Sequence, residues 1–206
     1  MTVRIAGLYA VTPDLADTAE LCSKVEQALR GGARVLQYRN KTAGDKLRIE
    51  QAAALQSLCR RYSVPLIIND HCELAQQVGA AGVHLGGEDG SLDAARHLIG
   101  TQALLGASCY DSLSLAEVAV AAGADHVAFG SFFPSPVKPD AVRPPLDLLT
   151  RARGALKVPV VAIGGITADN APALVSAGAD AVAVISALFS ADDIEAAARR
   201  FQSLFV

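Results

Sequence analysis

The chain has 206 residues, 51% of them hydrophobic, and a formal net charge of −3 at pH 7. This length suits one large domain or two small ones, and the apolar content is enough for a sizeable core. Basic and acidic residues are interspersed, without the charge block that would indicate binding to nucleic acid or to an anionic membrane. We therefore expect neither of these partners.

The four cysteines form no CxxC pair and have no histidine at metal-ligand spacing, which argues against structural zinc. We find no stretch with the charged start, apolar centre and small-residue cleavage site of a secretory signal. We also find no run of about 18 apolar residues that is free of charge. These observations favour a soluble, cytoplasmic protein with reduced thiols.

Short apolar runs rich in β-branched residues alternate with longer Ala/Leu segments at helical spacing, which is typical of successive βαβ units. The expected strands are Leu8 to Thr12, Arg34 to Arg39, Leu66 to Asn69, Gly82 to Leu85, Leu104 to Ser108, His126 to Gly130, Val160 to Ile163 and Ala181 to Ile185. The clearest helical patterns are Thr18 to Arg30, Lys46 to Tyr62, Leu113 to Ala122, Ala171 to Ala177 and Asp192 to Leu204.

A short phrase of Gly and Ala recurs where a helix ends and a strand begins, at Gly79 to Gly82, Ala122 to Asp125 and Ala177 to Asp180. Glycine there allows a left-handed helix end and a tight αβ turn. Eight such units with no break in composition predict a single (β/α)₈ TIM barrel over residues 1–206. The alternative, a doubly wound open sheet, more often stops at five or six strands.

In a barrel the reactive groups lie at the carboxyl ends of the strands. At the end of the second strand, Gln37, Arg39 and, if the extended chain continues, Lys41 alternate in phase with Val35, so we expect two cations and an amide at the barrel mouth. This placement indicates an anionic ligand. The alternative is that this face points outward, with the cations in solvent and Leu36 and Tyr38 pointing inward.

Two acidic turns follow the third and fourth strands, with Asp70 in the first and Glu88 and Asp89 in the second. Mg²⁺ prefers oxygen ligands and usually takes only one or two carboxylates from the protein. Asp70 and Asp89 fit this pattern, and together with the cations they suggest a diphosphate substrate. Alternatively, Asp70 caps the helix that starts near His71, and the other acids are ordinary turn residues.

Further polar groups follow the later strands. Ser108 ends the fifth strand, and the proline-containing loop after the sixth strand holds Ser135 and Lys138, which could enclose a phosphate. A rigid surface loop is the alternative. His84, a single histidine among apolar residues near the end of the fourth strand, is interpreted as a packed structural residue.

Gly164 and Gly165 follow the seventh strand, and a helix is expected to start after the eighth strand, which ends at Val184, Ile185 and Ser186. This is the place of the common phosphate site of TIM barrels, where backbone N–H groups hold the anion. A simple tight turn is the alternative for the glycine pair.

In this order the motifs resemble those of the thiamine-phosphate synthase (thiamine-phosphate pyrophosphorylase) family, over nearly the whole chain. The resemblance rests on the following segments: Leu8 to Thr12, Gln37 to Lys41, Ile68 to Asp70, Gly82 to Asp89, Gly106 to Ser108, Ser135 to Lys138 and Ile163 to Thr167. One departure is Val137, where family members often have threonine.

The resemblance implies a transferase of thiamine biosynthesis that joins a hydroxymethylpyrimidine diphosphate to a thiazole phosphate with the aid of Mg²⁺. It implies Asp70 and Asp89 as magnesium ligands, and Arg39, Lys41, Ser108 and Lys138 as catalytic residues. The substrate-binding residues that it implies are Gln37, Arg39, Lys41, Asn69, Ser108, Ser135, Lys138, Gly165, Val184, Ile185 and Ser186. A homo-oligomer is expected from the family alone.

Two alternatives to this function stay open. A thiazole tautomerase of the same superfamily would share the barrel and the thiazole phosphate site, but it would not need the set of cations and carboxylates. A thiazole-phosphate or thiamine-phosphate binding protein without catalytic activity would bind the product without releasing diphosphate.

Overall fold

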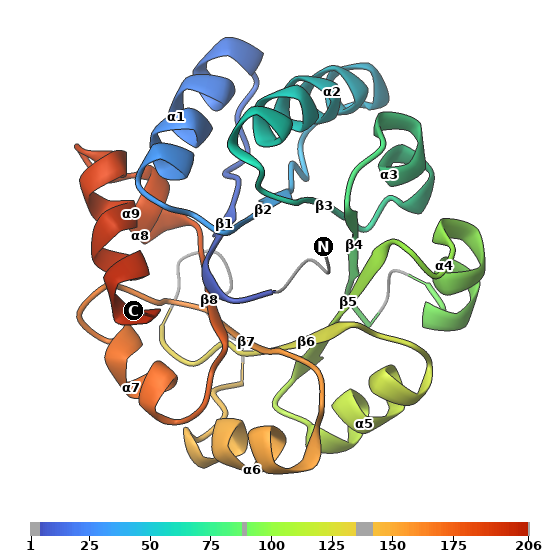
Figure 1. Ribbon diagram of the computed structural model, residues 1–206, viewed down its shortest axis with the longest axis vertical. Coiled ribbons are helices and arrows are strands. Elements are labelled where there is room, and N and C mark those ends of the chain that lie inside the picture. Colours follow the sequence, from blue (N-terminus) through green and yellow to red (C-terminus); the bar gives the residue numbers. More distant parts are fainter. Residues whose placement is uncertain (1–4, 88–89, 135–141, 206) are drawn as a thin grey trace.

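The computed structural model describes residues 5–87, 90–134 and 142–205. Its strands form a closed barrel in the order β1-β2-β3-β4-β5-β6-β7-β8, with the helices packed around the outside (Figure 1). The strands are β1 (Gly7–Val11), β2 (Val35–Tyr38), β3 (Leu66–Asn69), β4 (Gly82–Leu85), β5 (Leu104–Tyr110), β6 (His126–Phe129), β7 (Val160–Ile163) and β8 (Ala181–Val184).

All neighbouring strands pair in parallel, and β8 closes the barrel by pairing with β1, with Tyr9 opposite Ala183. The helices are α1 (Thr18–Arg30), α2 (Asp45–Tyr62), α3 (Cys72–Val78), α4 (Leu92–Ile99), α5 (Leu113–Ala121), α6 (Asp147–Ala155), α7 (Ala171–Ser176), α8 (Ser186–Phe189) and α9 (Ile194–Gln202), followed by the 3₁₀ helix η1 (Ser203–Phe205). The predicted (β/α)₈ barrel is confirmed, and the open sheet is excluded.

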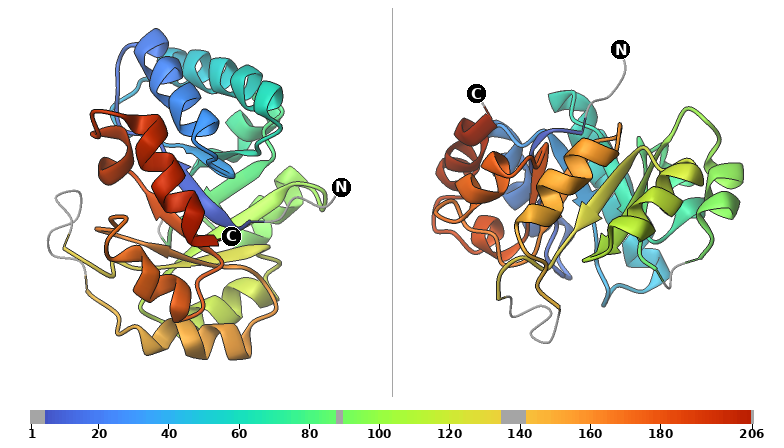
Figure 2. Two further views of the ribbon diagram at one scale, coloured as in Figure 1. Left: turned by 60° about the vertical axis from the view of Figure 1, so that its left-hand side comes forward. Right: turned by 90° about the horizontal axis from the view of Figure 1, so that it is seen from below.

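The core has two layers, separated by the barrel wall. Side chains that alternate outward from the strands, such as Leu36 and Tyr38, pack against the helices. The side views of Figure 2 show these helices wrapped around the barrel. The inward set forms a smaller cluster inside the barrel that includes Tyr9, Val35 and Val161. Because Val35 points inward, the residues in phase with it on β2 also point toward the interior.

Two of the recurring Gly-Ala segments end in an aspartate, and each aspartate connects neighbouring elements of the barrel. Asp125 accepts a hydrogen bond from the backbone N–H of Leu105 at 2.8 Å, and it also pairs with Arg96 from α4. Asp180 accepts in the same way from the N–H of Val160 at 2.9 Å and pairs with Arg153 from α6. Each aspartate therefore ties the start of its own strand to the preceding strand and to a helix.

None of the helices in the described part of the chain has the length and apolar character of a membrane span.

Candidate active site

A cavity of about 400 Å³, called the main cavity below, lies at the carboxyl ends of the strands. Its walls come from most strands of the barrel and from the segments that follow them. Among the predicted site residues, it is lined by Gln37, Arg39, Asn69, Ser108, Gly165, Val184, Ile185 and Ser186. The cavity therefore collects residues that are far apart in the sequence at the end of the barrel where barrel enzymes place their chemistry.

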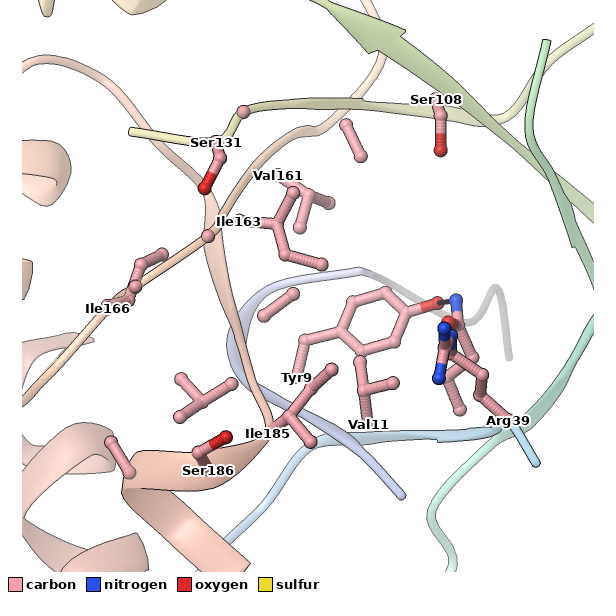
Figure 3. A pocket seen from close by; sticks show the side chains of 18 of the residues that line it. Tyr9, Val11, Arg39, Ser108, Ser131, Val161, Ile163, Ile166, Ile185 and Ser186 are labelled. Atoms are coloured by element: carbon pink, nitrogen blue, oxygen red, sulfur yellow. Dashed lines mark hydrogen bonds between the residues drawn. The ribbon is translucent and has the colours of Figure 1, made fainter. Parts of the chain in front are cut away.

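The polar groups of this cavity lie on two opposite sides. Figure 3 shows Arg39 and Ser108 on one side and Ser131 and Ser186 on the other. Apolar side chains stand between the two polar sides: Tyr9, Val11, Val161, Ile163 and Ile185. Such a cavity suits an elongated occupant, or two occupants, with polar ends and a flat apolar middle.

The end of β2 is held firmly against β1. Thr12 Oγ donates to the backbone carbonyl of Arg39 at 2.8 Å and accepts from the Arg39 N–H at 2.9 Å. Deeper in the barrel, the Gln37 side-chain amide donates to the Tyr9 hydroxyl at 3.0 Å. Burial raises the pKa of Tyr9 far above its usual value, so this phenol stays neutral. The alternation predicted for Gln37 and Arg39 thus brings both side chains into the cavity, and the outward-facing alternative is wrong.

Lys41 lies in an adjoining cavity of about 280 Å³, which shares Asn69 with the first one. The Lys41 ammonium donates to Asp70 Oδ2 at 2.6 Å. Asp70 has the uncommon left-handed conformation, with φ of 64°, directly after β3. It does not cap α3, because the N-cap residue of that helix is His71. The capping alternative for Asp70 is therefore wrong.

One acidic residue in this region was not anticipated from the sequence. Asp14 follows β1, and its Oδ1 accepts from the backbone N–H of Lys41 at 2.9 Å and from the Arg39 guanidinium at 3.4 Å. It thus contacts the Arg39 guanidinium directly and fixes the backbone, but not the ammonium, of Lys41. No sequence signal pointed to Asp14, because it lies in a loop without a motif and its hydrogen-bond donors are 25 and 27 residues away along the chain.

The donor chemistry around Asp70 suits a hard divalent cation. Its carboxylate and the Asn69 amide line the same cavity, and the carboxylate is only 13% exposed. Among the described residues, no group of three or more His, Cys, Asp or Glu could hold a metal. A sparse site of this kind fits Mg²⁺, which takes one or two carboxylates and leaves its remaining positions to water and phosphate. Asp89, the second predicted ligand, lies outside the described residues.

The two glycines after β7 allow a close approach of another segment. A Cβ on Gly164 would lie 2.0 Å from Ser131 Oγ, and a Cβ on Gly165 would lie 2.3 Å from the Pro134 carbonyl oxygen. Both glycines have positive φ, of 101° and 63°. The segment that follows β6 is bound here, because the Phe133 N–H donates to the Gly164 carbonyl at 3.0 Å. The pair therefore brings Ser131 and Pro134 to the cavity wall. Ser135, Val137 and Lys138, which come next, lie outside the described residues.

His84 is buried, as expected for a packed residue, but the structure also places it at the cavity. Its ring lines the main cavity, and Nε2 lies 3.0 Å from Ser108 Oγ. Its Nδ1 lies 3.4 Å from Nε2 of His126, which is fully buried inside the barrel. The available signal was the strand period, which places Gly82 and His84 on the inward face of β4.

A closed parallel barrel with its main cavity at the carboxyl ends of the strands is the architecture of a (β/α)₈-barrel enzyme. Residues 8–188 match the family described as thiamine monophosphate synthase. The chain is 57% identical to a thiamine-phosphate synthase of Azoarcus sp. (strain BH72) over 205 residues, which is 100% of both chains. It is 52% identical to a thiamine-phosphate synthase of Nitrosomonas eutropha over 203 residues, covering 98% and 96%. This chain therefore belongs to the thiamine monophosphate synthase family, and its similarity to these synthases makes it a transferase.

Solved structures agree with this assignment. A thiamine phosphate pyrophosphorylase from Pyrococcus furiosus aligns with a TM-score of 0.86 at 34% identity, covering 97% of this chain and 95% of that one. A 3-hexulose-6-phosphate synthase aligns with a TM-score of 0.73 at 18% identity, covering 97% and 100%, and supports the fold alone.

Proposed function

We propose that the protein joins 4-amino-2-methyl-5-hydroxymethylpyrimidine diphosphate to 4-methyl-5-(2-hydroxyethyl)thiazole phosphate, forming thiamine phosphate and diphosphate. The observation that carries the proposal is the main cavity, with polar groups on two opposite sides and apolar side chains between them. Two flat heterocycles in the middle would leave one phosphate group at each side. The names of the family and of its relatives support the same product.

The diphosphate belongs on the side of Arg39 and Lys41. Arg39 lines the main cavity and Lys41 the adjoining one, so a diphosphate that extends from one to the other would meet both cations. Asn69, which lines both cavities, would contact it between them. Ser108 and Gln37 would hold the pyrimidine end, and Lys138 is proposed to complete the cation set.

The thiazole phosphate belongs on the opposite side. Backbone around Gly165 and at Val184, Ile185 and Ser186 lines this side of the cavity, next to the Ser131 hydroxyl. Backbone N–H groups that lack a partner within a helix or strand are suitable phosphate donors. Ser135 is proposed to contribute from the adjacent loop. Because this end is anchored, capture of the pyrimidine becomes an effectively intramolecular step.

The chemistry needs little covalent help from the protein. The C–O bond between the pyrimidinylmethyl carbon and the diphosphate breaks, the electron pair leaves with the diphosphate, and the ring delocalises the positive charge. The thiazole nitrogen then donates its lone pair to this carbon. The nitrogen has no proton to lose, so the step requires no base. Arg39 and Lys41 stabilise the charge that develops on the leaving group.

Mg²⁺ would be held by Asp70 and Asp89, and when bound it would neutralise charge on the diphosphate. The residues themselves set where the leaving group sits. Lys41 is already paired with Asp70, so a ligand that enters the smaller cavity meets a positive and a negative group side by side. This arrangement suits a complex of an anion and a cation better than either one alone.

The proposal is tested by giving the purified protein both substrates with Mg²⁺ and then with EDTA. We expect thiamine phosphate and diphosphate in equal amounts, and both abolished by EDTA. Proton exchange on the thiazole without diphosphate release would instead indicate the tautomerase. Tight binding of thiamine phosphate with no turnover would indicate a binding protein.

A further inference from the structure

Three neighbouring strands place a glycine between two histidines, one on each side, at one level of the barrel interior. In the strand register, His84 of β4 is opposite Gly106 of β5, and Gly106 is opposite His126 of β6. The two rings meet across the glycine, with centroids 5.4 Å apart and an interplanar angle of 38°. On its other side, the His126 ring faces the Tyr9 ring of β1, and the two ring centroids are 6.1 Å apart.

Gly106 is the residue that makes this contact possible. A Cβ at this position would lie 2.3 Å from His126 Nε2 and 2.4 Å from His84 Nδ1. Real Cβ atoms do not approach other atoms this closely, so any side chain at position 106 would force the imidazoles apart. The row of histidine, glycine and histidine is therefore one structural unit.

The unit continues to the main cavity through Ser108. His84 Nδ1 lies 3.4 Å from His126 Nε2, and His84 Nε2 lies 3.0 Å from Ser108 Oγ. Ser108 lines the cavity, and its hydroxyl oxygen points away from its strand on the side of the cavity where Arg39 lies (Figure 3). A continuous path of hydrogen-bonding atoms thus connects the fully buried His126 to a hydroxyl on the cavity wall.

The surroundings of His126 give this path a direction. His126 Nδ1 is buried and has no hydrogen-bond partner among the described residues. A buried N–H without an acceptor is more costly and rarer than an unpaired acceptor, so the proton belongs on Nε2. His126 Nε2–H then donates to His84 Nδ1, and His84 Nε2–H donates to Ser108 Oγ. The Ser108 hydrogen is left to point into the cavity.

We propose that His126 is a positioning residue, which acts through His84 to hold the Ser108 hydroxyl as a hydrogen-bond donor toward the pyrimidine diphosphate. The ligand of Ser108 rests on the proposed function, whereas the direction of the hydrogen bonds does not. Desolvation lowers the pKa of His126 well below its usual range, which agrees with a neutral ring. Neither histidine is required to exchange a proton with the substrate.

The first test compares His126→Gln with His126→Asn. The glutamine amide nitrogen can occupy the place of the imidazole Nε2 and keep the donor to His84, whereas the shorter asparagine amide matches the place of Nδ1. We expect kcat/KM for the pyrimidine diphosphate to fall about tenfold in His126→Asn, the loss of one hydrogen bond, and to recover in His126→Gln. KM for the thiazole phosphate should change in neither variant.

A double-mutant cycle with Ser108→Ala shows whether His126 acts through the hydroxyl. We expect His126→Asn to cost nothing further in the Ser108→Ala background. Fully additive losses, or equal losses in His126→Gln and His126→Asn, would overturn the proposal.

The control is Val127→Ala. Val127 is the next residue on β6, and its buried side chain faces the helices, so this substitution should affect stability only. If His126→Asn does not fold, His126→Met takes its place, because it fills the volume without a donor.

The second test does not depend on activity. Long-range ¹⁵N–¹H NMR spectra of the imidazoles report which ring nitrogen carries the proton. Near neutral pH we expect His84 and His126 both to be protonated at Nε2 and unprotonated at Nδ1, with assignments from the His126→Gln variant. An Nδ1–H form of His84 would overturn the proposed direction. If the protein makes no thiamine phosphate, the proposed function fails, and these spectra still decide the hydrogen-bond chain.

Discussion

Arg39 and Lys41 stand two residues apart, yet they reach different cavities and have different acidic partners. Arg39 pairs with Asp14 at 3.4 Å, and Lys41 pairs with Asp70 at 2.6 Å. Lys41 is 52% exposed, and exposed ion pairs contribute little to the free energy of unfolding. The pair of Lys41 with Asp70 is therefore expected to add little to stability, and its proposed role is to position charge for a ligand. The sequence pattern predicted the cations, but the contact of Arg39 with Asp14 depends on how the loop after β1 folds.

We expect Asp70→Asn to lower kcat on the order of 100-fold, because it would remove the proposed carboxylate ligand of Mg²⁺ and the partner of Lys41. The melting temperature should change little, because Lys41 can turn to solvent. The measurement is steady-state turnover across a Mg²⁺ titration, which should also show weaker metal dependence at low concentrations.

Asp45→Asn is the matched control for this variant. Asp45 also pairs with a cation, Arg48, but its side chain is 94% exposed at the start of α2. Turnover of this variant should equal that of the wild type. Full activity in Asp70→Asn at every Mg²⁺ concentration would contradict the role of Asp70 as a ligand.

At the level of elements, the strand pattern predicted the barrel closely. The expected bounds of β3, β4 and β7 match the structure residue for residue. β5 extends beyond the expected end at Ser108 to Tyr110, where the register with β6 shifts and Tyr110 takes a positive φ of 53°. Such an irregularity depends on the neighbouring strand and not on local composition.

The contact between His84 and His126 could not be predicted for a related reason. It requires the register of three strands, with Gly106 between the two rings, and the sequence of one chain does not contain strand register. The alternation within each strand does show that His84 points inward. Periodicity therefore finds the face on which a side chain lies, whereas its partner requires the structure.

Gly165→Ala should disturb the cavity through the segment after β6. The added Cβ would collide with the Pro134 carbonyl, and alanine would be strained at a φ of 63°. We expect a loss of about 1–3 kcal/mol in the free energy of unfolding and a raised KM for the thiazole phosphate. Chemical denaturation and steady-state kinetics measure the two effects.

Gly154→Ala offers a contrasting substitution in α6. A Cβ there meets nothing within 4 Å, and the helix conformation suits alanine. This variant should gain about 0.5 kcal/mol in stability, with unchanged kinetics. If Gly165→Ala behaved like Gly154→Ala, the close packing at the glycine pair would not support the site.

For the molecule as a whole, the buried His126 links stability to pH. Burial lowers the pKa of His126 well below its usual value of about 6.5, and the charge of His84 acts in the same direction. Below pH 6.5 the unfolded chain binds a proton at this residue that the folded protein does not. The free energy of unfolding is therefore not reduced by this residue above pH 6.5. Below this pH it falls by about 1.4 kcal/mol per pH unit.

We expect this slope to appear as a difference between the wild type and His126→Gln. Chemical denaturation from pH 7.5 to 5 should show the wild type losing stability faster below pH 6.5, by the equivalent of one proton. Parallel curves for the two proteins would show that His126 is protonated in the folded state as readily as in the unfolded chain.

The central claim is the proposal that the barrel mouth holds a thiazole phosphate on one side of the main cavity and, on the other side, a diphosphate that extends into the adjoining cavity. A crystal structure of the protein with thiamine phosphate, diphosphate and Mn²⁺ tests this claim most directly. We predict the thiamine phosphate group against Gly165 and Ser186, the diphosphate against Arg39 and Lys41, and the anomalous signal of the metal at Asp70. Product bound elsewhere, or with its phosphate among the cations of β2, would contradict the account.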